Sequence, residues 1–145
     1  MPYRFTLSAV LKLRESIEER DLHVLEQTQH EIAHTLHLLE ILHDQERREI
    51  EVTERELAAG MSAVYLRIVE EARRKLWEHQ HSLEKCLTEL QLRRKQQLEN
   101  YKAAKRGRQV LSDLRDRQRE MYEAIAVRRQ QRITDDLFLV RHQKR

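Results

Sequence analysis

The sequence predicts an all-α protein in which two long helices form an antiparallel coiled-coil hairpin with a C-terminal helical overhang. The first observation is composition: 37% of the 145 residues are charged, 5% are aromatic, and there are two glycines and one proline. The second is that apolar residues recur at steps of three, four and seven in both halves, which is typical of long helices. The third is a single glycine, Gly60, between these halves. We expect one hairpin domain over 1–145, with helices at about 4–58 and 63–140 and a turn at about 59–62.

The first helix has one apolar face, and we call the face by which each helix contacts the other its seam. This face begins with Phe5, Val10, Leu13, Ile17 and Val24. From there it follows heptads, with Leu25, Ile32 and Leu39 predicted at one seam position and Leu36, Ile50 and Leu57 at the other. His43 and Glu46 interrupt the pattern, so the seam is only loosely apolar.

The turn is predicted from Gly60 and Ser62. Glycine suits the left-handed residue just past a helix end, and serine suits the N-cap of the next helix. Charge also favours a hairpin, because residues 1–60 carry 7 Lys and Arg against 13 Asp and Glu, whereas residues 61–145 carry 21 against 12. The alternative is one unbroken helix that tolerates a central glycine.

The second helix has a longer heptad pattern. One seam position is predicted to hold Leu76, Leu83, Leu90, Ala104, Leu111 and Ile125, and its partner position to hold Ala72, Cys86, Leu114 and Met121. Polar residues and a glycine interrupt the middle of this seam, namely Arg93, Gln97, Asn100 and Gly107. Trp77 and Tyr101 lie beside it, and we expect them to pack against the first helix.

The two helices differ in length, so part of the second has no partner. A fold at Gly60 places Phe5 opposite roughly Arg115 and leaves residues from about 116 onward as an overhang. Apolar residues on an unpaired helix mark a partner surface. Those of the overhang are Met121, Tyr122, Ile125, Val127, Ile133, Leu137, Phe138 and Val140.

A zinc-protease motif is present but is not interpreted as a catalytic site. Residues 30–34 read His-Glu-x-x-His, which would place two zinc ligands one helical turn apart. His30 and His34 each lie two residues from Ile32, about 200° around the helix from the seam, so they should face solvent. A catalytic zinc also needs a third protein ligand. We expect no enzyme activity, no cofactor and no metal.

Other features limit the remaining function classes. The basic stretches at 93–97 and 102–108 could contact phosphates, but no nucleic-acid-binding motif accompanies them. Cys86 is the only cysteine, which excludes an internal disulfide and favours a reducing compartment. No apolar run is long enough to cross a bilayer. The expected class is a cytoplasmic interaction protein, with a coiled-coil scaffold or nucleic-acid binder as the alternative.

Both ends of the chain resemble the FliJ family. At the N-terminus the resemblance is carried by an aromatic residue, a hydrophobic pair, an arginine and paired glutamates, which are Phe5, Leu7, Val10, Leu11, Arg14, Glu18 and Glu19. At the C-terminus it is carried by a basic run with glutamine and an acidic pair, which are Arg128, Arg129, Gln131, Arg132, Asp135 and Asp136. Thr134 stands where the family often has leucine.

The resemblance implies a role in flagellar type III protein export. Family members form a two-helix coiled coil similar to the shaft of rotary ATPases, enter the hexameric ring of the export ATPase FliI, contact the export gate protein FlhA and handle export chaperones. The implied location is cytoplasmic, with only peripheral association to the cell membrane at the flagellar base. The equivalent stalk protein of a virulence secretion system is the alternative.

The resemblance also implies which residues bind each partner, because positions of the family's motifs can be matched to this sequence. The resemblance implies an ATPase-binding set of Phe5, Leu7, Leu11, Arg14, Arg128, Arg129, Arg132, Asp135 and Asp136. It implies an export-gate-binding set of Ile68, Ala72, Lys75 and His79. Because Ala72 and His79 also fall on the predicted seam, packing against the first helix is the alternative for that set.

Overall fold

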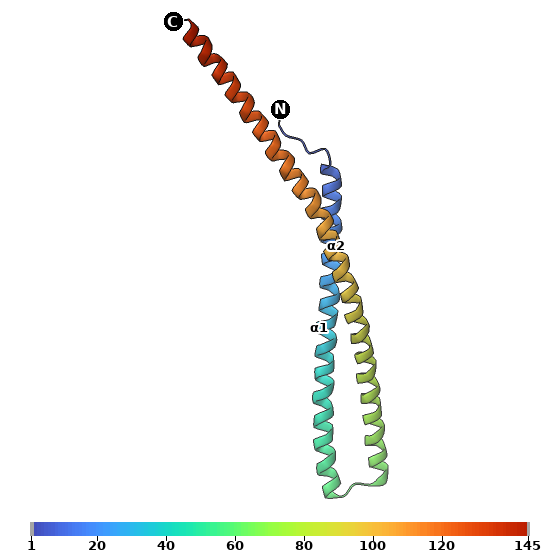
Figure 1. Ribbon diagram of the computed structural model, residues 1–145. Helices are drawn as coiled ribbons and strands as arrows, with labels where there is room; N and C mark the ends of the chain where they lie inside the picture. The colour runs from blue at the N-terminus through green and yellow to red at the C-terminus, as the bar shows by residue number, and fades with distance from the viewer. Residues whose placement is uncertain (1, 145) are drawn as a thin grey trace. The chain divides into compact units, whose positions relative to one another are not determined.

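The computed structural model describes residues 2–144 and consists of two helices joined by a short turn (Figure 1). Helix α1 spans Ser8–Ala59, and helix α2 spans Ala63–Gln143. Residues 2–144 contain no strand. The predicted all-α hairpin is therefore confirmed.

The turn is formed by the two residues that the sequence indicated. Gly60 has φ +91°, and its N–H donates to the carbonyl of Leu57 at 3.3 Å. Ser62 caps α2, because its Oγ accepts from the N–H of Tyr65 at 3.3 Å and its carbonyl accepts from the N–H of Leu66 at 3.1 Å. The alternative of one unbroken helix is therefore wrong, since the C-terminal end of α1 and the N-terminal end of α2 are both capped at the turn.

The start of α1 differs from the expectation. Residues from Pro2 to Phe5 have no regular structure, and the helix begins at Ser8 rather than at about residue 4. The physical reason is the packing of this segment against α2. Phe5 is only 8% exposed, and the Tyr3 hydroxyl donates to the carbonyl of Arg115 and to Oε1 of Gln118, each at 3.3 Å.

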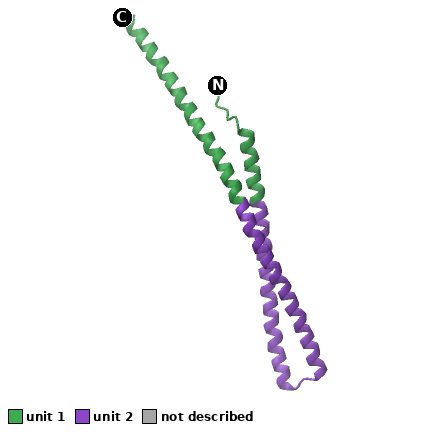
Figure 2. Ribbon diagram, turned by 45° about the vertical axis from the view of Figure 1, so that its right-hand side comes forward, with its two compact units in different colours: residues 1–21, 101–145 green, residues 22–100 purple. Residues whose placement is uncertain are grey.

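The chain divides into two compact units, each containing a stretch of both helices (Figure 2). The turn unit comprises residues 22–100, and the terminal unit comprises the residues up to Asp21 together with those from Tyr101. The seam of each unit is described separately below.

In the turn unit, one row of the predicted α1 seam is confirmed and the other is wrong at two of its three residues. Leu25 and Leu39 are buried as expected and Ile50 is half-buried, but Leu36 and Leu57 are 49% and 51% exposed. The second row lies one residue earlier in the sequence. It consists of Thr28, Thr35 and Leu42, which are buried, and Glu49 and Glu56, which are half-buried.

Helix α2 shows the same difference of one residue. Leu76, Leu83 and Leu90 turn inward as predicted, whereas Ala72, Cys86, Arg93 and Asn100 are exposed. The partner row consists of Gln80, which is 7% exposed, and Leu87, which is half-buried. Burying polar side chains is tolerated here because they are hydrogen-bonded: Thr28, Thr35 and Thr53 donate to carbonyls one turn back in α1, and Gln80 donates to Glu46.

The terminal unit has an apolar seam with one ion pair inside it. Leu11 and Ala104 are 4% and 8% exposed. Arg108 Nε lies 2.6 Å from Glu18 Oε2, and both side chains are largely shielded from solvent. Leu114 and Met121, predicted in the seam, are 37% and 66% exposed, again because the row in contact lies one residue away.

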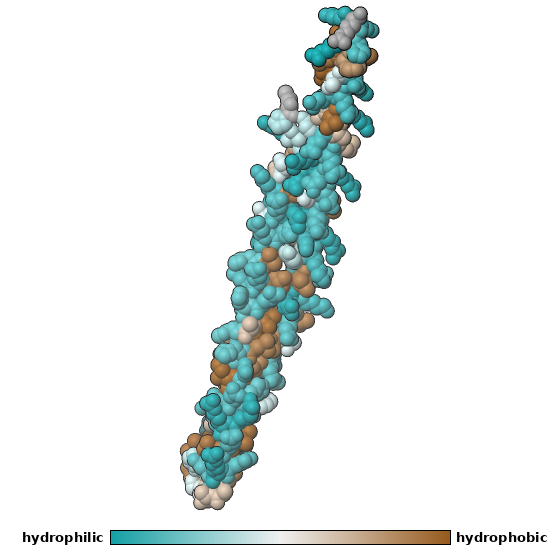
Figure 3. Space-filling model, turned by 90° about the vertical axis from the view of Figure 1, so that its left-hand side faces the viewer, coloured by the Kyte–Doolittle hydropathy of each residue, from teal (hydrophilic) through white to brown (hydrophobic). Residues whose placement is uncertain are grey.

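The two aromatic residues beside the predicted seam behave differently. Tyr101 is half-buried. Trp77 is 59% exposed and stacks on His81, with ring centroids 5.0 Å apart, so its expected packing against α1 is wrong. The face shown in Figure 3 is mostly hydrophilic, and apolar side chains appear on it as separate patches.

Candidate partner-binding surfaces

The first candidate surface is a stripe near the start of α2, formed by Ile68, Ala72, Lys75 and His79. Steps of four, three and four residues place these side chains on one helical face. All four are exposed, and Ile68 is 59% exposed. The alternative for Ala72 and His79, burial in the seam, is therefore wrong, because the seam uses Gln80 in the adjacent row.

An apolar groove adjoins this stripe. Ile68 and Ala72 form part of its wall, and its volume is about 310 Å³. Val69 and Tyr65 from α2 and Val52 from α1 supply further apolar surface. The remaining lining residues are Arg48, Glu49, Thr53 and Glu56. Such a groove, lined by both apolar and charged residues, can accept an apolar side chain of a protein partner.

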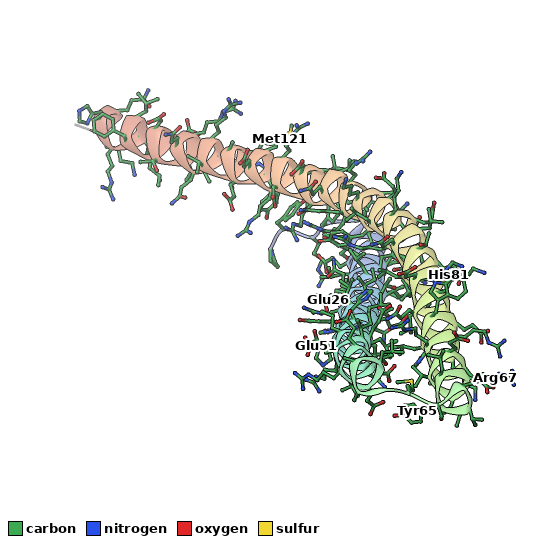
Figure 4. All side chains as sticks on the ribbon, turned by 90° about the horizontal axis from the view of Figure 1, so that it is seen from below. Glu26, Glu51, Tyr65, Arg67, His81 and Met121 are labelled. Atoms are coloured by element: carbon green, nitrogen blue, oxygen red, sulfur yellow. The ribbon has the colours of Figure 1, made fainter. Side chains whose placement is uncertain are left out.

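Tyr65 is held at this groove by an acidic neighbour. A hydrogen bond to the Glu56 carboxylate, reinforced by that negative charge, raises the pKa of Tyr65 above its ordinary value of 10.0. Tyr65 projects from the first turns of α2 beside the connection to α1 (Figure 4). The neutral phenol therefore bridges the two helices next to the exposed Ile68.

The second candidate surface is the part of α2 that has no partner within the described chain. Residues 116–144 are all exposed. Tyr3 reaches Gln118 and packs its ring 5.7 Å from that of Tyr122, so intramolecular contact continues to Tyr122 rather than ending near Arg115. We call residues 123–143 the free helix.

The free helix carries an apolar stripe that begins at this last contact. Tyr122, Ala126, Arg129, Ile133, Leu137 and Val140 share one face, because they follow one another at steps of three and four. Ile133 and Leu137 are 61% and 58% exposed. Met121, one residue away, projects from α2 into solvent (Figure 4). The chain thus presents an amphipathic helix face with an arginine in its centre.

The structure does not bring all nine predicted ATPase-binding residues to the surface. Leu7 is 38% exposed, and Arg14 is also exposed. Arg128, Arg129, Arg132, Asp135 and Asp136 are exposed on the free helix. Phe5 and Leu11, however, are 8% and 4% exposed. These two side chains can support a partner surface only through their packing on α2.

Sequence reasoning missed a cleft at the root of the free helix. It is lined by Tyr3, Phe5, Arg115, Arg119, Tyr122 and Glu123, with a volume of about 600 Å³. Three of its six lining residues are aromatic in a chain that is only 5% aromatic. The available signal was that aromatic residues stand both near the N-terminus and near residue 122, two segments that the predicted hairpin brings to the same end.

The histidine motif forms no comparable site. His30 and His34 are exposed, as their spacing from Ile32 predicts. Within residues 2–144, no group of three or more His, Cys, Asp or Glu side chains is placed to hold a metal ion. The same residues include no helix that is both long and apolar enough to cross a membrane.

Comparison with known families decides the context of these surfaces. The family described as "Flagellar FliJ protein" matches residues 3–145. The chain belongs to the FliJ family. No curated protein and no solved structure matches it. Membership makes this FliJ-family chain a component of flagellar type III protein export.

Proposed function

We propose that this FliJ-family chain is the central stalk of the export ATPase and also contacts the export gate, so that it links the two. The observation that carries the proposal is the free helix, an amphipathic face on which Ile133 and Leu137 are more than half exposed. A helix end of this kind suits insertion into the axis of a ring, because apolar residues there find partners that the chain itself does not supply.

The ATPase-binding surface combines the free helix with the segment packed at its root. Leu7, Arg14, Arg128, Arg129 and Arg132 provide exposed contacts, and Asp135 and Asp136 extend them toward the C-terminus. Phe5 and Leu11 are assigned a supporting role, since both are buried against α2. The partner is the FliI hexamer, whose assembly the stalk promotes.

The gate-binding surface is the stripe formed by Ile68, Ala72, Lys75 and His79, whose partner is FlhA. Its support is the exposure of all four residues and the apolar groove that Ile68 and Ala72 help to line. Because α2 is one continuous helix from Ala63 to Gln143, it carries both surfaces. Transfer of export chaperones completes the role, which places the protein in the cytoplasm and peripherally at the membrane face of the flagellar base.

The ATPase contact is tested by changing the apolar stripe to a charged one. The double variant Ile133→Asp with Leu137→Asp should abolish stimulation of purified FliI ATPase activity. The matched control, Leu92→Asp with Val110→Asp, places two charges at exposed apolar residues of α2 outside both proposed binding sets and should keep stimulation. Retained stimulation in the stripe variant, with normal helicity by circular dichroism, would move the ATPase contact elsewhere.

The gate contact is tested with Ile68→Asp in a binding assay against the cytoplasmic region of FlhA. Trp77→Asp is the matched control, because Trp77 is also 59% exposed and lies nine residues away, about 180° around α2. We expect Ile68→Asp to lose FlhA binding without a change in thermal stability, and Trp77→Asp to keep both. Equal binding by the two variants would contradict the assignment.

A further inference from the structure

In the turn unit, each helix buries a partly polar row beside an adjacent row that is largely exposed. In α1 the buried residues Thr28 and Thr35 neighbour a row in which Leu36 and Leu57 are exposed and Ile50 is half-buried. In α2 the buried Gln80 and half-buried Leu87 neighbour a row that contains Ala72, His79 and Cys86, all exposed. Each helix therefore offers two alternative seams that share one row.

The polar groups in the seam do little to favour the packing that is present. The hydroxyls of Thr28, Thr35 and Thr53 donate to the carbonyls of Val24, Glu31 and Glu49 in their own helix, at 3.2, 2.9 and 2.7 Å. These bonds move with the helix, so rotation of α1 would not break them. Gln80 Nε2 donates across the seam to Glu46 Oε2 at 3.2 Å, and rotation would break that bond.

One seam residue is also unsatisfied. Gln97 belongs to the shared row of α2, and its Oε1 is buried without a hydrogen-bond partner. Buried polar atoms are normally paired, and an unpaired one raises the free energy of the packing that contains it. Rotation of α2 would bring Arg93 and Asn100, both hydrogen-bond donors, into the seam beside Gln97.

Geometry permits the exchange without sliding of the helices. Leu36 follows Thr35 by one residue, and Cys86 precedes Leu87 by one, so replacing one pair by the other leaves the axial level unchanged. The shared rows, with Leu25, Ile32 and Leu39 in α1 and Leu76, Leu83 and Leu90 in α2, stay in contact. Each helix needs to turn by about 50° about its axis, half of the angle between successive residues. Because the helices are antiparallel, both turn in the same sense.

We propose that the turn unit is a two-state coiled coil, with a second packing in which both helices have rotated so that Leu36 faces Cys86 and Ile50 faces Ala72. The second packing buries the leucines that are half-exposed at positions 36 and 57, and it gives up the Gln80–Glu46 hydrogen bond. It also brings the polar rings of His43 and His79 into the seam, and the cost of burying them opposes it.

The second packing would regulate the gate-binding surface, and this step rests on the proposed function above. Ala72 and His79 are exposed in the packing described here but face α1 after rotation. A partner that binds them can therefore bind only one of the two states, and its binding draws the population toward that state. The rotational state of the two helices would therefore determine whether the gate protein can bind this surface.

The single native cysteine allows a direct test. In the Leu36→Cys variant, mild oxidation should form an intramolecular disulfide between the thiol introduced at position 36 and Cys86. Mass spectrometry of the monomer measures how much of this disulfide has formed. In the present packing Cys86 lines a groove with His34 and Thr35, on the flank away from Leu36, so this bond reports the rotated state. Thr35→Cys with Leu87→Cys, in a Cys86→Ser background, reports the described state.

A matched control separates rotation from random opening. Leu36→Cys with Lys85→Cys, in a Cys86→Ser background, keeps the axial level but places the second thiol on the outer, exposed side of α2 in both packings. We expect the 36–86 bond to form at least about tenfold faster than this control, and adding Thr35→Leu to slow it about fivefold by favouring the described seam. A 36–86 rate equal to the control, or insensitive to Thr35→Leu, would overturn the proposal.

Binding to the cytoplasmic region of FlhA then tests the functional step. The oxidised 36–86 variant should lose binding, and the oxidised 35–87 variant should keep it. If the reduced proteins fail to bind, the gate assignment fails while the cross-linking result still decides the two-state seam. If both oxidised variants bind equally, rotation does not regulate the gate surface.

Discussion

The seams of the two units are held by different kinds of contact. In the terminal unit, Glu18 and Arg108 form a short ion pair inside the seam, and the Arg14 side chain lies against Gly107. In the turn unit, the buried threonines bond to their own helix. An ion pair between helices fixes one rotational setting, whereas locally bonded threonines and leucines are compatible with more than one.

This difference assigns separate tasks to the two units. The terminal unit contains the root of the free helix and needs one defined geometry, which Tyr3 and the Glu18–Arg108 pair provide. The turn unit contains the stripe from Ile68 to His79, whose exposure depends on which α2 row faces inward. In the proposed two-state packing, the terminal unit keeps its interhelical ion pair, whereas the interhelical Gln80–Glu46 hydrogen bond of the turn unit breaks when the helices rotate.

The largest expected effect tests which residues form the turn-unit seam. Leu39→Ala should lower the free energy of unfolding by about 2–4 kcal/mol, because a leucine that is 7% exposed leaves a cavity when truncated. Leu36→Ala, at a residue that is 49% exposed, should cost less than about 1 kcal/mol. Urea unfolding followed by circular dichroism measures both. Equal losses would show that both rows are in the seam.

The next effect tests the fixed seam of the terminal unit. Glu18→Gln should lower Tm by a few degrees, because it leaves Arg108 without its charged partner in a shielded position. The control is Glu78→Gln, which removes a partner of Arg74 from a pair 4.0 Å apart with both side chains more than 60% exposed, and should leave Tm unchanged. Exchanging the two charges, with Glu18→Arg and Arg108→Glu, should recover part of the loss.

The two glycines should respond with opposite signs, one in each unit. Gly60→Ala should destabilise by about 1–2 kcal/mol, because φ of +91° is strained for a residue with a side chain. Gly107→Ala should be neutral or stabilise by up to about 1 kcal/mol through helix propensity. An added Cβ there would lie 3.5 Å from Nη1 of Arg14, an ordinary contact. Destabilisation at Gly107 would indicate that close approach of Arg14 matters more than propensity.

The smallest effect concerns Tyr65 at the groove of the turn unit. Its pKa is raised by the Glu56 hydrogen bond, so the neutral phenol and its contact are retained below pH 10 and are lost as pH rises through the higher pKa. Ultraviolet titration should give the Tyr65 phenolate a midpoint above 10, assigned to this residue by its loss in Tyr65→Phe. Glu56→Gln should move that midpoint down toward 10, and an unchanged midpoint would mean that Glu56 is not the cause.

The sequence specified the turn and one row of each seam, but not the second rows. Gly60 and Ser62 act locally, so their residue types were enough to place the turn. The second rows depend on the cost of burying threonine against the gain from burying leucine. A threonine whose hydroxyl bonds one turn back is inexpensive to bury, and residue type alone does not reveal this bond.

The same limit applied to the candidate sites. The arginines at 128 and 129 are exposed, and their position on the predicted overhang was sufficient to place them on the surface, whereas the sequence left Ile68 open between a partner surface and packing against the first helix. Phe5 and Leu11 match the family pattern equally well but are buried, because the N-terminal segment folds onto α2 through Tyr3. That contact joins residues more than a hundred positions apart, which no local pattern can predict.

The unpaired end of α2 has a consequence for how tightly it can bind. The free helix needs no nucleation, since it continues a helix already formed at Glu123, but beyond that point no tertiary contact opposes fraying. Its amide hydrogens should therefore exchange with solvent progressively faster from Glu123 to Gln143. If Val140 contacts the ATPase ring as proposed, binding must first hold the last turns in helical form, and the entropy lost in doing so is subtracted from the affinity. Substitution of the exposed Thr134 by alanine, which has a higher helix propensity, should increase the affinity of that contact without adding a new one.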